Sequence, residues 1–130
     1  MEIRNFKTMS RILIVEDDPF LSEMYTSKLE EAGFSVDVIV DGKEGLKKIL
    51  EDKPDLVLLD IVLPKMDGFE ILQAVRKEPK LKEIKIIALT NLGQKEEIEK
   101  GLAFGANDYI VKAHYTPSEV VAKVRKILEK

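Results

Sequence analysis

Short runs of mostly apolar residues recur along the chain and are separated by longer stretches in which apolar and polar residues alternate. The runs cover residues 11–15, 34–40, 56–60, 84–89 and 108–111. Runs of this length between turn-forming residues are typical of strands buried on both faces of a parallel sheet. Ser35 and Asp37 interrupt the second run, which favours a place for it at an edge of the sheet.

The stretches between the runs show the three- and four-residue spacing of amphipathic helices. The first helix is expected to begin at Pro19, with Asp18 as its N-cap. The last is expected to begin at Pro117, where Thr116 and Glu119 form a capping box. Three further helices are expected after Asp41, after Gly68 and over residues 96–104.

Strand and helix alternate five times in this reading of the chain. Such alternation implies an α/β domain with a parallel sheet and helices on both faces. We expect one domain over residues 9–130, because 130 residues suit a single hydrophobic core. Met9 can be the original start, so residues 1–8 are interpreted as an N-terminal extension or an expression remnant.

Composition excludes several classes of function. The chain has no cysteine, which excludes disulfides, thiolate catalysis and cysteine-based zinc sites. Its formal net charge of −3 argues against nucleic-acid binding through bulk positive charge. No apolar segment approaches the roughly 20 residues of a membrane span. We therefore expect a cytoplasmic protein with no membrane and no direct nucleic-acid partner.

Polar side chains follow the apolar runs abruptly, at equivalent places in separate strand–helix units. These strand ends carry Glu16-Asp17-Asp18, Asp41, Asp60, Thr90-Asn91 and Lys112. In an open parallel sheet, the carboxyl ends of the strands meet at one edge, where ligands bind. The sequence therefore predicts that side chains distant along the chain converge into one acidic site with a lysine beside it.

The residue types at this edge indicate phosphoryl transfer. Clustered carboxylates repel one another unless one is protonated or a cation lies between them, and oxygen ligands favour a hard ion such as Mg²⁺. A carboxylate beside such an ion can attack phosphorus, which would make Asp60 an aspartyl phosphate. Lys112 and the Thr90 hydroxyl can compensate the charge of the transferred group. Asp18 fits a helix cap better than a metal ligand, and His114 is expected in an exposed loop.

Four motifs, taken together and in order, resemble the receiver domain of two-component response regulators. They are Ile-Leu-Ile-Val-Glu16-Asp17, then Leu-Leu-Asp60-Ile-Val-Leu-Pro64-Lys-Met-Asp-Gly68, then Ala-Leu-Thr90, then Gly105-Ala-Asn-Asp-Tyr109-Ile-Val-Lys112. The resemblance runs from about Arg11 to Lys130 and includes the related single-domain chemotaxis regulators. It implies that the domain over residues 9–130 is a receiver domain with a flavodoxin-like (βα)5 fold. Its five-stranded parallel sheet would have the order 2-1-3-4-5.

The resemblance also assigns the acceptor and the metal ligands. It implies that Asp60 accepts a phosphoryl group from a phosphohistidine on a sensor histidine kinase or phosphotransfer protein. It implies that Asp17 and Asp60 ligate Mg²⁺, that Glu16 acts through water, and that the backbone carbonyl of Val62 completes the protein ligands.

Three further residues take implied roles in a signalling switch. Thr90 and Lys112 contact the phosphoryl oxygens, and Tyr109 moves inward when Thr90 is drawn toward the phosphate. The face formed by the fourth helix, fifth strand and fifth helix then changes for a downstream output protein. The chain would be a phosphoacceptor that catalyses its own phosphorylation and dephosphorylation rather than an enzyme, and a phosphorylation-dependent homodimer stays open.

Two positions depart from the family pattern and keep an alternative open. Asn91 follows the threonine, where the family usually has a small residue, and Ala113 follows the lysine, where it usually has proline. A cis peptide before alanine would cost about 2.5–4 kcal/mol, so this bond is expected to be trans. The alternative is a pseudo-receiver, a protein interaction module that works without phosphorylation.

Two other classes of protein fit the residues less well. An aspartate-nucleophile phosphohydrolase needs a second aspartate two residues after the nucleophile, where this chain has Val62. A flavodoxin-type FMN carrier needs a phosphate loop rich in glycine and hydroxyl groups after the first strand. Glu16, Asp17 and Asp18 stand there instead and would repel a phosphate.

Overall fold

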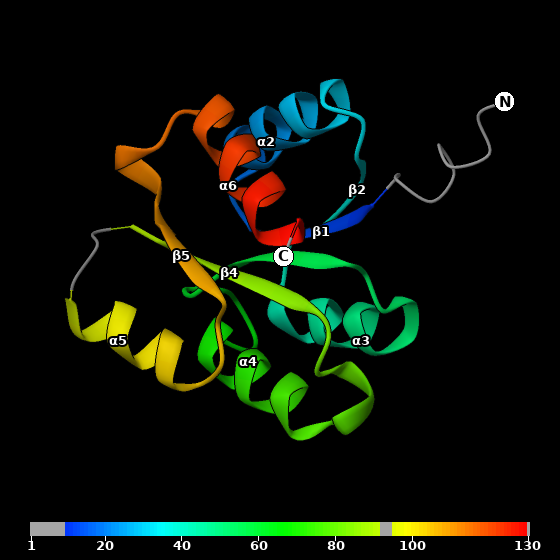
Figure 1. The fold of residues 1–130 in the computed structure, drawn as a ribbon. Helices are drawn as coiled ribbons and strands as arrows, with labels where there is room; N and C mark the ends of the chain where they lie inside the picture. The colour runs from blue at the N-terminus through cyan, green and yellow to red at the C-terminus, as the bar shows by residue number, and fades with distance from the viewer. Residues whose placement is uncertain (1–9, 92–94, 130) are drawn as a thin grey trace, which may run out of the picture.

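A single parallel sheet forms the centre of the molecule (Figure 1), and the computed structural model describes residues 10–91 and 95–129 of it. The strands are β1 (Arg11–Val15), β2 (Ser35–Ile39), β3 (Leu56–Asp60), β4 (Lys85–Thr90) and β5 (Asp108–Val111). They lie in the order β2-β1-β3-β4-β5 and all pair in parallel. This order confirms the predicted one. The predicted extension over residues 1–8 lies outside the described residues, as does Met9.

Helices cover both faces of the sheet, as expected from the alternation of strand and helix. They are α2 (Pro19–Glu31), α3 (Gly42–Asp52), α4 (Gly68–Lys77), α5 (Lys95–Ala103) and α6 (Pro117–Leu128). Figure 1 shows α2 and α6 on one face and α3, α4 and α5 on the other. Two short 3-10 turns, over Pro79–Leu81 and Lys112–His114, were not predicted.

The alternating side chains of the strands divide the core into two apolar clusters. Ile12 and Ile14 of β1 belong to the cluster under α2 and α6, whereas Leu13 and Val15 belong to the cluster on the opposite face. Every residue of β3 is buried, because this central strand has a layer of helices on each side. A strand covered in this way must be nearly all apolar, so the one carboxylate at its end, Asp60, requires partners.

Side-chain caps fix the starts of helices α2, α4 and α6. The Asp18 side chain accepts hydrogen bonds from the backbone N–H groups of Phe20 and Leu21, which confirms its predicted role as the cap of α2. The predicted capping box at Thr116 is present at the start of α6. A second capping box, formed by Asp67 and Glu70 at the start of α4, was not predicted.

Strand β2 is the least apolar strand and lies at one edge of the sheet, as its sequence predicts. Its central residue, Asp37, is exposed to solvent. Among the helices that the structure describes, none combines the length and the apolar character needed to cross a membrane.

Lys53, just after α3, has a left-handed backbone conformation, with φ at 48° and ψ at 63°. A side chain in this region is strained, whereas glycine is not. We expect Lys53→Gly to stabilise the protein by about 1 kcal/mol in urea unfolding. Lys53→Ala is the matched control, because it removes the same charge and keeps the strain. Equal stability of the two variants would contradict the prediction.

Candidate functional site

The carboxyl ends of four strands bring the predicted residues to one edge of the sheet. Glu16 follows β1, Asp60 ends β3, Thr90 ends β4 and Lys112 follows β5. The strands pair in register up to these ends, so that Asp60 lies opposite Leu89 in β4. Residues separated by up to 96 positions in the sequence therefore lie around one site because the pairing of the sheet requires it.

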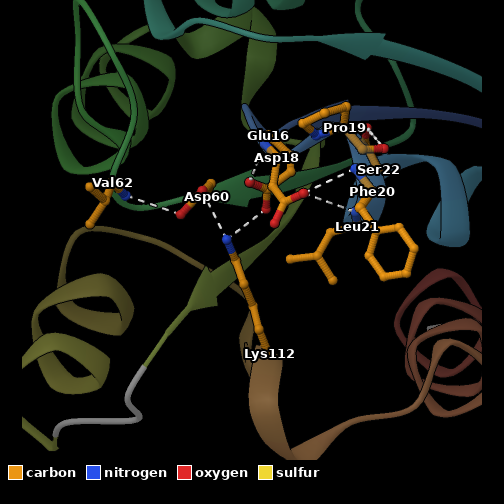
Figure 2. Close-up of polar contacts among 9 residues, drawn as sticks. All are labelled: Glu16, Asp18, Pro19, Phe20, Leu21, Ser22, Asp60, Val62 and Lys112. Carbon is orange, nitrogen blue, oxygen red and sulfur yellow. Dashed lines mark hydrogen bonds and ion pairs between the residues drawn. The ribbon is translucent and has the colours of Figure 1, made fainter.

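Lys112 forms ion pairs with two buried carboxylates at this edge. Its Nζ lies 2.7 Å from Glu16 Oε1 and 2.9 Å from Asp60 Oδ2. Figure 2 shows the lysine side chain extending from the end of β5 to these two groups. Glu16 is fully buried and Asp60 is 3% exposed, so the ammonium provides charge compensation that water cannot.

The second oxygen of each carboxylate accepts a hydrogen bond from a nearby backbone N–H group. Val62 N donates to Asp60 Oδ1 at 3.1 Å, and Asp18 N donates to Glu16 Oε2 at 3.0 Å. Both carboxylates are therefore held at both oxygens, and their orientation is fixed before any ligand binds. The Val62 side chain is 64% exposed and lies beside Asp60 at the rim of the site (Figure 2).

Gly68, at the start of α4, packs directly against the backbone that carries Asp60. Its N–H donates to Ile61 O at 2.8 Å. A Cβ at this position would lie 2.5 Å from Asp60 O and 2.7 Å from Ile61 Cα. From the sequence, Gly68 was expected only to precede a helix, whereas the structure shows that α4 can approach the acceptor strand only if residue 68 has no side chain.

Burial and neighbouring charges perturb two ionisable groups of the site. Burial raises the pKa of Glu16 to about 7; Lys112 opposes this change and Asp60 adds to it. Burial by itself would lower the pKa of Lys112, but its contacts with Glu16 and Asp60 raise it. The lysine therefore stays charged, while Glu16 is the group whose protonation is sensitive near neutral pH.

Three carboxylates of the site can face one cation. Glu16, Asp17 and Asp60 each offer one oxygen, and these oxygens lie within 4.8 Å of one another. Asp17 is exposed to solvent, whereas the other two are buried, so an ion from solution could enter the site past Asp17. Oxygen donors of this kind suit Mg²⁺, which keeps several water ligands and binds through few carboxylates. The donor set therefore fits the predicted metal.

The two residues predicted to act as a switch lie in different environments. Thr90 is 2% exposed, and its hydroxyl is buried without a hydrogen-bond partner among the described residues. Tyr109 lies opposite Ala88 on the edge strand β5, and the Nζ of Lys123 is 5.7 Å from its ring centroid. Tyr109 is therefore near the site along the strand but is not a member of the charged cluster.

The two departures from the family pattern lie at the margin of the site. Asn91 is exposed. No peptide bond in the described residues is cis, so the bond between Lys112 and Ala113 is trans, as expected. His114 is exposed in the 3-10 turn that follows β5, also as expected.

Comparison with known protein families gives one clear result. The sequence model described as "Response regulator receiver domain" matches residues 12–125 of this chain. The chain is 39% identical over 122 residues to the DNA-binding dual master transcriptional regulator RpaA of Synechocystis, covering 94% of this chain and 50% of the relative. The chain thus spans about half the length of the curated relatives that it matches.

Solved structures agree with this family. The chemotaxis response regulator CheY4 of Vibrio cholerae has a TM-score of 0.85 and 31% identity, covering 92% of this chain and 99% of that one. The BeF3-activated N-terminal receiver domain of RstA from Klebsiella pneumoniae has a TM-score of 0.83 and 33% identity, with the same two coverages. With its sheet order and acidic strand ends, this chain belongs to the response regulator receiver domain family.

Proposed function

We propose that this receiver domain is a phosphorylation-dependent switch that accepts a phosphoryl group on Asp60. The observation that carries the proposal is the environment of this carboxylate. It is nearly buried, its Oδ2 lies 2.9 Å from Lys112 Nζ, and it shares a cation-compatible cluster with Glu16 and Asp17. A buried carboxylate between a fixed cation and a metal-binding set is suited to react with an anionic donor.

The proposed reaction is a simple transfer. An Asp60 oxygen attacks the phosphorus of a phosphohistidine, the bond from phosphorus to the imidazole nitrogen breaks, and the bond electrons return to that nitrogen. A bound Mg²⁺ would supply charge compensation for the transferring group. Glu16 and Asp17 would hold it together with Asp60 and the carbonyl of Val62. Lys112, which already contacts Asp60, would offset charge on the phosphoryl oxygens.

The phosphorylated form has a net charge that the resting contacts do not accommodate. The phosphoryl group of an aspartyl phosphate carries about −1.5 to −2 charges, in place of the single negative charge of the Asp60 carboxylate. The Thr90 hydroxyl is free to donate to a phosphoryl oxygen, because it has no partner among the described residues. Movement of Thr90 toward the phosphate would vacate space for Tyr109, and the surface around β5 would change for an output partner.

Partners follow from the family. We propose that the phosphodonor is a sensor histidine kinase or a phosphotransfer protein and that the exchange takes place in the cytoplasm. The relative RpaA is named as DNA-binding and is about twice the length matched here. The output could therefore be a separate protein or a further domain of a longer chain. The similar RstA receiver was crystallised in a BeF3-activated form, which supports a switch of this type.

A pseudo-receiver is the second candidate, and the departures at Asn91 and Ala113 favour it. It would use the same fold as an interaction surface without phosphoryl transfer. Lys112 nevertheless contacts Asp60 at 2.9 Å although no proline follows it. This contact favours the phosphorylated switch over the pseudo-receiver.

Incubation with acetyl phosphate and Mg²⁺ should add one phosphoryl group to the protein, measured by intact mass. Asp60→Asn should abolish the gain, because it removes the nucleophile, and EDTA should suppress it. Asp37→Asn is the matched control, since Asp37 is an exposed aspartate on the far edge strand. A wild-type protein that gains no mass and binds no Mg²⁺ would support the pseudo-receiver.

Glu16 should make the metal-free protein less stable as pH rises. Burial raises the pKa of Glu16 in the folded state from 4.5 to about 7. Its contribution to stability is thus complete below about pH 4.5 and is lost as pH rises through 7. Glu16→Gln mimics the protonated form, so urea unfolding in EDTA should show the variant gaining stability relative to wild type between these pH values. Parallel stability curves would contradict this linkage.

Thr90→Ala should separate phosphorylation from the response of Tyr109. Asp60 keeps its nucleophile in this variant, but the proposed contact that draws residue 90 inward is lost. In protein labelled with fluorotyrosine, phosphorylation should shift the ¹⁹F resonance of Tyr109 in wild type, and most of this shift should be absent in Thr90→Ala. Tyr109→Phe identifies the resonance. An undiminished shift in Thr90→Ala would show that Tyr109 responds by another route.

A further inference from the structure

Tyr25 of α2 has a polar hydroxyl but lies among apolar side chains. It is 2% exposed and packs with Ile12, Ile14 and Leu29 in the cluster between the sheet and the helices α2 and α6. Its hydroxyl is buried and has no hydrogen-bond partner among the described residues. Because an unpaired buried hydroxyl destabilises a folded protein, leucine or phenylalanine would serve these contacts better.

The helix directs this hydroxyl toward the functional site. Side chains on a helix point back toward its N-terminus, and α2 begins at Pro19, directly after Glu16, Asp17 and Asp18. Tyr25 lies less than two turns into this helix. A side chain as long as tyrosine therefore extends from the core toward the carboxyl edge of the sheet.

Charges of the site act on this hydroxyl. Burial raises the pKa of Tyr25, Lys112 opposes the rise, and Glu16, Asp60 and Asp18 add to it. These four residues lie at the carboxyl edge of the sheet, toward which the Tyr25 side chain extends.

The lysine has capacity for another acceptor. An ammonium group carries three N–H donors. One of them donates to Asp60 Oδ2 at 2.9 Å, and Nζ also forms an ion pair with Glu16 Oε1 at 2.7 Å. A side chain that is only 9% exposed leaves its third donor little access to bulk water. An unpaired donor and an unpaired hydroxyl thus lie in the same buried region.

We propose that Tyr25 is a positioning residue for Lys112, whose third N–H reaches the Tyr25 hydroxyl through one bridging water molecule. Such a water has two polar partners in a buried polar region, which is the minimum that internal waters have. A third contact of this kind would restrict the ammonium, so that the lysine keeps its position when a phosphoryl group joins Asp60. The role in phosphorylation rests on the proposed function, whereas the contact itself does not.

A stability cycle tests the contact without phosphorylation. Tyr25→Phe should lower the urea midpoint of the wild-type protein, because it leaves the water and Lys112 without a partner. In a Lys112→Met background the same change should raise the midpoint, because the hydroxyl is then only an unpaired buried group. A Tyr25→Phe substitution that raises the midpoint in both backgrounds would overturn the proposal.

The kinetic test uses acetyl phosphate and Mg²⁺. Tyr25→Phe should lower the phosphorylation rate constant at saturating donor about five-fold and leave the half-saturating donor concentration unchanged, because the ammonium acts on the transferring group. Thr26→Val is the matched control, because it removes another buried, unpaired hydroxyl from α2. It should leave both the phosphorylation rate constant and the half-saturating donor concentration unchanged, and it should not lower the urea midpoint. An unchanged rate constant in Tyr25→Phe would also overturn the proposal.

The two tests separate this inference from the proposed function. If wild type is phosphorylated on Asp60 and Tyr25→Phe behaves like Thr26→Val, only the role of Tyr25 fails. If wild type gains no phosphoryl group, the proposed function fails. The reversal in urea midpoint would then still decide whether Tyr25 and Lys112 are coupled.

Discussion

The ion pairs of Lys112 with Glu16 and Asp60 are the interaction on which the functional edge depends. Two carboxylates almost without access to water are costly unless a positive charge lies between them. The lysine provides that charge at 2.7 and 2.9 Å, and backbone N–H groups satisfy the remaining oxygens. When both carboxylates are ionised, the lysine offsets only one of the two buried negative charges, and a divalent ion bound by Glu16, Asp17 and Asp60 would compensate the charge that remains.

Much of this arrangement follows from the sequence because the signals are local and repeated. The apolar run over residues 56–59 indicates a strand that is buried on both faces. The alternation of strand and helix indicates that the strands pair in parallel and that helices cover both faces of the sheet. Once strand order is known, polar residues at the strand ends must meet. The cap at Asp18 was predictable in the same way, because an aspartate before proline has a specific role at a helix start.

Other features depend on distances that no local pattern contains. The sequence suggested a lysine opposite the acids but not its direct contact with Glu16, which depends on how β5 and the following turn place the ammonium. The steric demand at Gly68 arises from the approach of α4 to the acceptor strand. The capping box of Asp67 and Glu70 does have a sequence signal, the spacing Asp-x-x-Glu at the start of a helix, and was predictable from it.

Strand β2 has a consequence for how copies of this protein meet at high concentration. Its outer side has unpaired backbone donors and acceptors, which in other proteins invite a second chain to extend the sheet. An apolar strand at this exposed edge would make the molecule prone to fibrous association. The exposed carboxylate of Asp37, midway along β2, would bring like charges together in any such stack. The low hydrophobicity of this edge thus also protects the fold against aggregation.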